Sequence, residues 1–395
     1  MRRFLIICIS FILCCPLTAC SAFEPTSTSE VTSEQPTVAP NGPKKIAVLL
    51  PLQGKYGESG QAIRNGFMAA FYAHKNLNGS APAIKVLDTS GQNINTVYQQ
   101  AISDGADVIV GPLDKEQVQS LIKTTTLQVP TLALNSVTPE KVPNLIQFAL
   151  SQSDEADQVA SHAFQNGHRR ALIIAPAGAW GNGIVEGFKN RWQKGGGEIA
   201  DQLSYQNPNQ LSEQIRQVLH AEKAGPRKAK AKPTAQEEGK PIIQRRQDID
   251  MIFLVAEPER ARQIIPLLKF YYAGKIPVYA TSLIYSGVSN PDHDNDLDNI
   301  QFTDMPWVLG GLSDNLQAIQ QNAAELWKNS YLHNPKLYAL GADAYQLSVS
   351  LNQLKSSPSQ SIHGGTGTLH LQENQHILRE LPWAKIRNGN PSILQ

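Results

Sequence analysis

The residue whose chemistry is indicated most clearly is Cys20. It directly follows Leu17–Ala19, a stretch that ends in two small residues. The apolar run at 4–15 comes after two arginines and is too short to cross a bilayer comfortably as a permanent span. This pattern predicts a secretion signal over 1–19 that is removed, and a thiol at Cys20 that forms a thioether with a diacylglycerol. The alternatives are an ordinary signal peptide and a plain membrane anchor.

The other cysteines favour the same interpretation, because all of them lie within the predicted signal. The four cysteines are Cys8, Cys14, Cys15 and Cys20. The folded domain is therefore expected to contain neither a disulfide nor a thiol nucleophile, and to be held by an ordinary apolar core. The whole chain has a formal net charge of +1, and no long basic stretch favours nucleic acid as a partner.

Three glycines, at 54, 57 and 60, stand between a predicted strand and a predicted helix. A dinucleotide-binding loop would occupy that place. The spacing differs from G-x-G-x-x-G, so a strand-to-helix turn that needs flexible residues explains these glycines better. We therefore expect no cofactor.

Aspartates at 292, 294, 296 and 298 alternate like the first ligands of a calcium loop. Leu297 and Thr303 occupy the positions where such a loop needs glycine and glutamate, so a solvated acidic loop is expected instead of a metal site. The nine histidines form no H-E-x-x-H pair, and the chain has no G-x-S-x-G. The sequence does not bring together a nucleophile, a base and an orienting acid, which argues against an enzyme.

The elements that must position these residues alternate between strand and helix. Short apolar runs bounded by turn residues predict buried strands, and apolar residues at helical spacing predict the helices between them. The first predicted strands are 46–50, 84–87, 108–110 and 131–134. The alternation restarts at a helix from 154. We therefore predict the α/β class, with two Rossmann-like lobes whose parallel sheets are flanked by helices.

The domain organisation follows from changes in composition. Residues 20–43 are rich in Ser, Thr, Pro and Glu and predict a disordered tether between the lipid and a domain at 44–395. Lobe 1 is expected to comprise about 44–150 and 277–350, and lobe 2 about 151–276 and 351–395.

Two stretches interrupt the alternation of strands and helices. Residues 289–304 are acidic and predict a loop. The stretch 223–246 is rich in Lys, Arg, Ala, Pro and Glu and has almost no large apolar residues, so it predicts a solvated insertion. Its last residues, Arg245 and Arg246, directly precede a strand. They could serve a partner or lie on a solvated edge.

A cleft between the two lobes would be the natural ligand site. The loops that follow the strands would line it, and helix N-termini there could hold a carboxylate. The predicted cleft-lining residues are Gln53, Gly54, Tyr56, Gly111, Pro112, Asn135, Ser136, Pro176, Trp180 and Glu257. This hypothesis makes the chain a lipid-anchored solute-binding protein for an amino acid or a similar small polar ligand.

The strand at 46–50, the loop after it, and the run Val108–Pro112 resemble the opening of type I periplasmic binding proteins. Longer strings stand at 245–256, 264–266, 277–282, 304–307, 367–371 and 379–386. They resemble the C-terminal domain of the LpoA family, lipoprotein activators of a penicillin-binding protein. The resemblance extends over essentially all of 44–395.

The resemblance implies an outer-membrane lipoprotein that binds and activates a class A penicillin-binding protein and so stimulates peptidoglycan synthesis. Ser21 after the cysteine, by similarity to Gram-negative lipoproteins, favours the outer membrane. Longer family members carry a helical-repeat domain where this sequence has about twenty residues. At up to ~3.5 Å per residue such a segment reaches at most ~80 Å.

Overall fold

The computed structural model describes residues 42–138, 141–221, 245–357 and 359–394. These residues belong to one of two units into which the chain divides, the unit at 36–395. Cys20, most of the predicted tether and nearly all of the predicted insertion lie outside the described residues.

The first lobe is built on a five-stranded parallel sheet with the order β2-β1-β3-β4-β5. Its strands are β1 (Lys45–Leu50), β2 (Ala83–Asp88), β3 (Val108–Val110), β4 (Thr131–Ala133) and β5 (Leu145–Gln147). The central strands are near-continuous apolar runs because helices cover both faces of a parallel sheet. The helices that connect its first four strands are α1 (Gly57–Asn78), α2 (Ile94–Ser103) and α3 (Lys115–Thr124).

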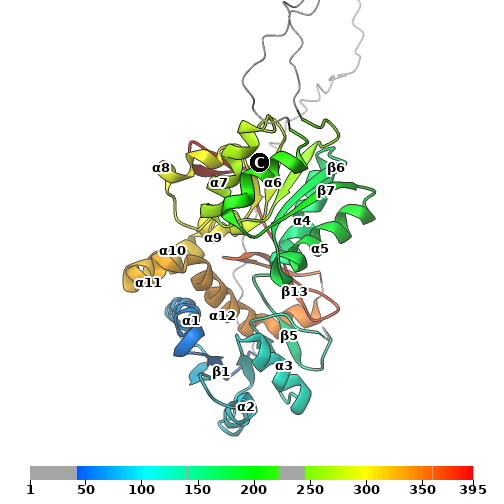
Figure 1. Ribbon diagram of the computed structural model, residues 1–395. Helices are drawn as coiled ribbons and strands as arrows, with labels where there is room; N and C mark the ends of the chain where they lie inside the picture. The colour runs from blue at the N-terminus through cyan, green and yellow to red at the C-terminus, as the bar shows by residue number, and fades with distance from the viewer. Residues whose placement is uncertain (1–41, 139–140, 222–244, 358, 395) are drawn as a thin grey trace, which may run out of the picture. The chain divides into compact units, whose positions relative to one another are not determined.

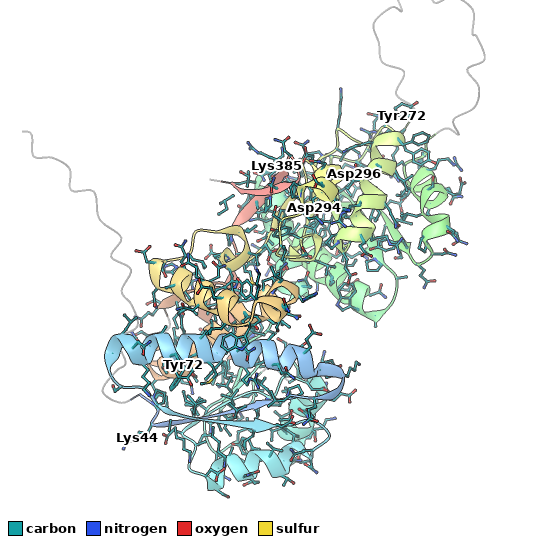
Figure 2. All side chains as sticks on the ribbon, turned by 90° about the vertical axis from the view of Figure 1, so that its left-hand side faces the viewer. Lys44, Tyr72, Tyr272, Asp294, Asp296 and Lys385 are labelled. Carbon is teal, nitrogen blue, oxygen red and sulfur yellow. The ribbon has the colours of Figure 1, made fainter. Side chains whose placement is uncertain are left out.

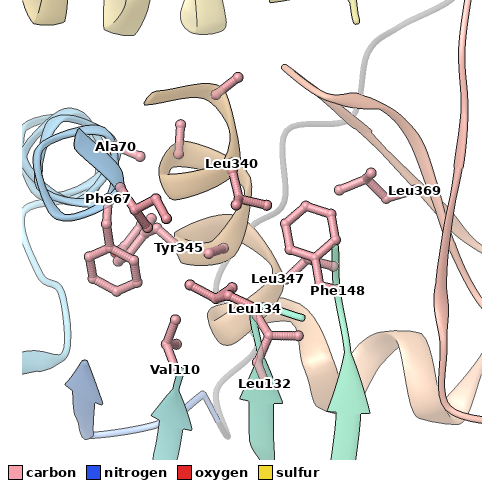
Figure 3. Close-up of a cluster of buried hydrophobic side chains, with 14 of the residues drawn as sticks. Phe67, Ala70, Val110, Leu132, Leu134, Phe148, Leu340, Tyr345, Leu347 and Leu369 are labelled. Carbon is pink, nitrogen blue, oxygen red and sulfur yellow. The ribbon is translucent and has the colours of Figure 1, made fainter. Parts of the chain in front are cut away.

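Four helices from late in the chain also belong to the first lobe: α9 (Pro306–Leu309), α10 (Asp314–Leu326), α11 (Lys328–His333) and α12 (Pro335–Ser356). Helix α12 packs against α1 and the sheet, so nearly all of its middle section is buried. Figure 3 shows Tyr345 of α12 beside Phe67 of α1, with the two rings edge to face at 5.2 Å. This core joins segments that are nearly 300 residues apart in the sequence.

The second lobe has a seven-stranded sheet with the order β15-β14-β10-β9-β8-β6-β7. Strands β6 to β10 run parallel, and β14 pairs with β10 in antiparallel fashion. Its strands are β6 (Arg170–Pro176), β7 (Glu198–Tyr205), β8 (Met251–Leu254), β9 (Val278–Ala280), β10 (Gln301–Thr303), β14 (Trp383–Arg387) and β15 (Asn390–Ile393). The main helices are α4 (Gln152–Gln165), α5 (Ala179–Lys194), α6 (Leu211–Val218) and α7 (Pro258–Phe270).

A small antiparallel sheet completes the first lobe. It consists of β11 (Ser361–Gly364), β12 (Gly367–Leu371) and β13 (Ile377–Glu380). Leu369 and Ile377 belong to the same apolar cluster as α1 and α12, and Figure 3 shows Leu369 facing Phe148 and Leu347. The chain therefore passes between the lobes three times, at 148–151, 304–305 and 381–382.

The predicted α/β architecture with two helix-flanked parallel sheets is confirmed (Figure 1). The predicted lobe boundaries at 277 and 351 are wrong. Strands β9 and β10 join the second sheet, whereas residues 351–380 pack with the first lobe. An apolar run shows that a strand is buried but does not show which sheet it joins, so the alternation of elements could not place these segments.

The acidic stretch at 289–304 is also different from the prediction of a solvated loop. It forms two short turns of helix, α8 (Pro291–Asp294) and a 3₁₀ turn, η4 (Asn295–Leu297). Asp294 is buried and accepts a hydrogen bond from Arg262 of α7 at 2.7 Å, whereas Asp296 is exposed (Figure 2). Helix α7 is therefore fixed to this stretch by a partly buried ion pair.

Within the described residues, no helix is long and apolar enough to cross a membrane. No group of three or more His, Cys, Asp or Glu side chains among those residues is placed to hold a metal ion.

We expect Gly66→Ala to lower the free energy of unfolding by about 1–3 kcal/mol, the usual cost of overpacking a close contact. A methyl group at Gly66 would lie 2.0 Å from the backbone oxygen of Tyr338, so α1 and α12 would have to separate. Urea unfolding measures the change.

Gly183→Ala in α5 is the matched control, because its methyl group would meet open space. Alanine should stabilise this helix by about 0.5–1 kcal/mol. Equal effects of the two substitutions would contradict the close packing of α1 on α12.

Candidate functional site

The predicted cleft residues of the first lobe lie at the carboxyl ends of its strands, as the sequence led us to expect. Gln53 lies next to the end of β2, where its backbone N–H donates to Ser90 Oγ at 2.9 Å and its amide donates to Asp88 at 3.3 Å. The Asn135 amide donates to the Leu113 carbonyl at 3.0 Å. Carboxyl ends of parallel strands share one edge of a sheet, so these loops form one polar rim.

Two of the predicted residues are required by the backbone itself. Gly111 has a φ of +105°, and a methyl group there would lie 2.1 Å from the Leu49 carbonyl oxygen. Gly54 has a φ of +68° in the turn before α1. Both positions favour glycine because a Cβ atom strains the left-handed region. These two glycines are accounted for by the turn and the packing of the loops, as the sequence suggested for Gly54.

The predicted residues of the second lobe lie at the carboxyl edge of its own sheet. Pro176 ends β6, Glu257 precedes the first turn of α7, and Trp180 lies in the first turn of α5 with 54% of its surface exposed. Between them, the Tyr205 hydroxyl donates to the Val255 carbonyl at 2.8 Å, and burial raises the pKa of Tyr205 to about 12. The contacts that hold each group of loops are made within its own lobe.

Three buried polar atoms near the edge of the first sheet lack a hydrogen-bond partner among the described residues. They are Thr89 Oγ1, Gln117 Oε1 and Ser136 Oγ. Thr89 and Gln117 are neighbours, because the Gln117 amide donates to the Thr89 carbonyl at 3.0 Å. A buried polar group without a partner costs about 1–3 kcal/mol, so these three atoms are exceptions in a rim whose other polar groups are hydrogen-bonded.

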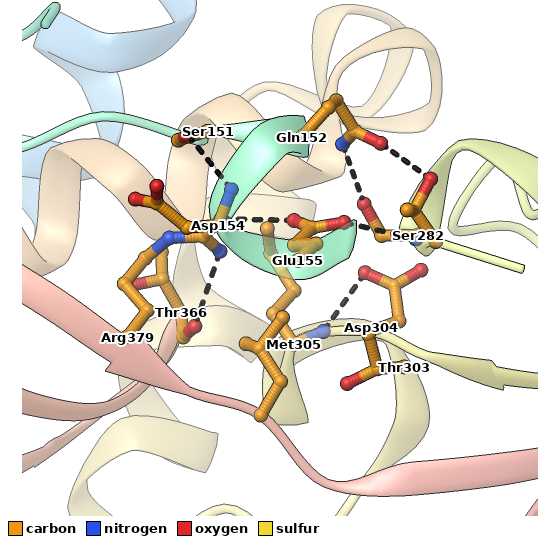
Figure 4. Close-up of polar contacts among 12 residues, drawn as sticks. Ser151, Gln152, Asp154, Glu155, Ser282, Thr303, Asp304, Met305, Thr366 and Arg379 are labelled. Atoms are coloured by element: carbon orange, nitrogen blue, oxygen red, sulfur yellow. Dashed lines mark hydrogen bonds and ion pairs between the residues drawn. The ribbon is translucent and has the colours of Figure 1, made fainter. Parts of the chain in front are cut away.

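A second polar cluster, the junction network, joins the two lobes where the chain passes between them. Its centre is the ion pair between Arg379 of β13 and Glu155 of α4, with 2.8 Å between nitrogen and oxygen. The side chains are 4% and 1% exposed. The other Glu155 oxygen accepts from the backbone N–H of Ser282 at 3.0 Å (Figure 4). A buried charge pair of this kind is tolerated only when its remaining hydrogen bonds are satisfied.

Helix α4 holds β13 through two further contacts. The Gln158 side chain donates to the Arg379 carbonyl at 2.9 Å and accepts from the Leu381 N–H at 3.1 Å, as a neighbouring strand would. His376 Nε2 lies 2.8 Å from the Asp154 carboxylate. The start of the second lobe is therefore fixed to the last segment of the first.

Lys336 also belongs to the junction network and connects α12 with the second lobe. The Lys336 ammonium donates to Asp304 at 2.7 Å and to the carbonyl oxygens of Ser282 and Tyr285 at 2.7 and 2.8 Å. Burial raises the pKa of Asp304 to about 6, although the Lys336 charge opposes this rise. The ammonium satisfies three acceptors that would otherwise be buried without a donor.

Asp343, on the buried face of α12, orders the loop before β12. Its carboxylate accepts from the backbone N–H groups of Gly365 and Thr366, both at 2.7 Å, and from the Thr366 hydroxyl at 2.5 Å. Burial raises the pKa of Asp343 to about 6. The Arg379 guanidinium donates to the Thr366 carbonyl at 3.5 Å, so this loop touches the central ion pair.

An open depression of about 770 Å³ lies beside the junction network. Gln158 of α4 and residues of the β12–β13 hairpin line it, among them Leu371 and Leu378. His370 Nε2 lies 3.4 Å from the Glu380 carboxylate on its wall. None of the predicted cleft residues lines this depression.

The sequence reasoning did not single out the junction network as a site. Asp304 and Arg379 lie within the strings that carry the family resemblance, but nothing in their spacing pairs them with distant residues. Asp343 carries a usable signal, because it is the one acid in the apolar helix Ala339–Leu351. A lone charge on a buried helix face must find a partner.

We expect Arg379→Met to lower the free energy of unfolding by about 3–5 kcal/mol, because Glu155 would remain buried without its cation. Adding Glu155→Gln should recover most of that loss, since glutamine can still accept from the Ser282 N–H. Urea unfolding of the single and double variants measures the coupling.

Arg170→Met is the control for this prediction, since its ion pairs with Glu198 at 3.3 Å and Asp248 at 3.6 Å are largely exposed. Exposed pairs contribute no more than about 1 kcal/mol. A small effect of Arg379→Met, or no recovery in the double variant, would show that the junction does not depend on this pair.

Comparison with protein families gives a match over residues 30–389 to the family described as "LppC putative lipoprotein". The chain is 32% identical over 354 residues to the penicillin-binding protein activator LpoA of Vibrio antiquarius (strain Ex25), covering 87% of this chain and 57% of that protein. For LpoA of Serratia proteamaculans (strain 568) the identity is 33%, with coverages of 78% and 46%. The chain thus spans about half the length of the curated relatives it matches.

Among solved structures, the fold is similar to the LpoA C-domain from Haemophilus influenzae, described as a regulator of PBP1A. The TM-score is 0.70 at 24% identity, covering 89% of this chain and 100% of that one. It is also similar to the leucine-binding protein LivK from Thermotoga maritima, with a TM-score of 0.53 at 16% identity and coverages of 89% and 97%. At these identities the comparisons show the fold.

Proposed function

This chain belongs to the LppC lipoprotein family, and on that premise we propose that it is a lipid-anchored regulator that binds and activates a class A penicillin-binding protein. The observation that carries the proposal is the family match over 30–389, together with 32–33% identity to proteins named as penicillin-binding protein activators. The region they share with this chain is the two-lobed domain.

The chemistry of the domain supports a binding role over a catalytic one. The buried carboxylates of the junction network are each held by a cation or by N–H and O–H donors, so they are committed to the fold. A catalytic acid or base instead has to face a substrate with a pKa suited to proton transfer. The relatives' names likewise describe activators.

The location that we propose is the inner face of the outer membrane, with lipid on Cys20 and Ser21 following it. Several acyl chains at ~0.8 kcal/mol per buried CH₂ hold a protein stably at a bilayer. Labelled palmitate should enter the wild-type chain and not Cys20→Ser, and fractionation should find the label in the outer membrane. Equal labelling of both chains would contradict anchoring at Cys20.

The function is tested with the full chain and a purified class A penicillin-binding protein in detergent. We expect a dissociation constant at or below about 1 µM, within the range of specific protein interfaces, and faster polymerisation of lipid-linked disaccharide-pentapeptide. Adding the chain without the synthase should give no polymer. Absence of both binding and stimulation would exclude the proposed activator.

The polar loops at the carboxyl ends of the first sheet favour a second candidate, a receptor for a small polar solute. A ligand at 100 times its dissociation constant would add ~2.7 kcal/mol to the stability. A melting-temperature screen with amino acids and cell-wall fragments separates the two candidates. No shift with any of these compounds would count against the receptor.

A further inference from the structure

Two large aromatic side chains are exposed together at the end of α7, in the second lobe. Phe270 is 60% exposed and Tyr272 is 57% exposed. Three cationic residues accompany them: Lys269 and Lys275 in the same segment, and Arg245, which donates to the Tyr272 carbonyl at 2.8 Å. We name these five residues the aromatic–cationic patch. Figure 2 shows Tyr272 projecting from the end of this lobe.

Tyr272 is held in a backbone conformation that tyrosine seldom adopts. Its φ is +64°, in the left-handed region, where α7 ends with hydrogen bonds from Tyr272 N–H to the Lys269 carbonyl and from Ala273 N–H to the Leu268 carbonyl. Glycine is the usual residue at such a helix end. Because the ring is exposed, it gains little from packing within the lobe. The side chain at this position is therefore better explained by a contact outside the chain.

Within the described part of the chain, the positive charge of the patch has no carboxylate partner. Several other arginines of this lobe face carboxylates: Arg246 faces Asp201 and Asp248, Arg262 faces Asp294, and Arg216 faces Glu213.

Arg245, by contrast, donates to the carbonyl oxygens of Tyr272 and Arg246, and no carboxylate of the described residues lies within ion-pair distance of it. Burial alone lowers the pKa of Arg245. The Lys269 ammonium donates to the backbone oxygen of Asp296 at 3.3 Å, and it forms no ion pair with a carboxylate of the described residues. Among those residues, positive charge therefore accumulates around the two exposed rings.

We propose that the aromatic–cationic patch is the surface by which this chain docks onto an acidic face of its penicillin-binding partner. The identity of the partner rests on the proposed function, and the patch gives the chemistry of the contact. Tyr, Phe and Arg are enriched in the cores of protein interfaces, and complementary charge speeds association.

An anionic bilayer fits this surface less well. The exposed Asp296 lies beside Lys269 and would be repelled by acidic headgroups. A protein surface can avoid this carboxylate locally, whereas a continuous layer of headgroups cannot.

The decisive variant is Tyr272→Gly, because glycine suits a φ of +64° and should leave the melting temperature unchanged or raise it. We expect it to weaken binding to the detergent-solubilised synthase at least tenfold, the effect of losing a hot-spot aromatic. Biolayer interferometry with the full chain measures the affinity. Tyr72→Ala on α1, which removes a tyrosine that is 53% exposed, should bind like the wild type.

Charge is tested with Lys275→Glu against Lys75→Glu, an exposed lysine in the last turn of α1. Lys275→Glu should slow association several-fold at 50 mM salt and much less at 300 mM, because salt screens the steering field. Lys75→Glu should leave the association rate unchanged at both concentrations.

The outcomes separate this inference from the proposed function. If the wild type binds the synthase and the Tyr272→Gly and Lys275→Glu variants bind equally well, the docking surface lies elsewhere and the proposed function stands. If the wild type does not bind at all, both proposals fail.

Phosphatidylglycerol vesicles test whether the patch binds an anionic bilayer instead. The Cys20→Ser chain is used, so that the protein's own lipid does not contribute to vesicle binding. Loss of vesicle binding in the patch variants, with synthase binding intact, would overturn the inference in favour of a membrane surface.

Discussion

The buried ion pair between Arg379 and Glu155 is the contact on which the arrangement at the lobe junction depends. Removing both charges from water costs several kcal/mol per ion, and only a close, fully hydrogen-bonded partner offsets that cost. At 2.8 Å, with Glu155 also bound to the Ser282 N–H, the pair meets this condition. Neither charge can stay buried alone, so α4 and β13 must meet in one register. Gln158 fixes that register by bonding to the backbone on both sides of Glu380.

The other buried charges extend this constraint to the remaining connections. Lys336, at the start of α12, forms an ion pair with Asp304, which follows β10. Asp343 in the same helix accepts hydrogen bonds from the loop that leads to β12. Apolar side chains tolerate small displacements, whereas a hydrogen-bonded charge tolerates few. The three passages between the lobes are thus specified by polar contacts, while the interior of each lobe is specified by packing, as the close approach of Gly66 to α12 illustrates.

The sequence predicted local features well and long-range partners poorly. Runs such as Ile46–Leu50 are buried on both faces, so composition alone identifies them as strands of a parallel sheet. The sheet to which β9 belongs depends on pairing with β8 and β10, which no local pattern encodes. Arg379 and Glu155 are 224 residues apart, so no local sequence pattern could predict their pairing either. The prediction of a solvated loop at the acidic stretch was wrong for the same reason, because Asp294 is buried against Arg262 of another element.

The pairing of charged side chains inside the domain also limits which parts of its surface can recognise a partner. The carboxylate and the arginine at the centre of the junction network are paired with each other, and such a buried pair cannot be released without a large loss of stability. Recognition must therefore use groups that the fold leaves uncommitted. The rim of the first sheet offers polar loops suited to a small ligand. The second lobe offers the aromatic–cationic patch, whose exposed rings and unmatched charge suit a protein surface. The regulator that we propose acts by contact and needs the second kind of site, so our docking proposal rests on Tyr272 and its neighbours and not on the strand-end loops.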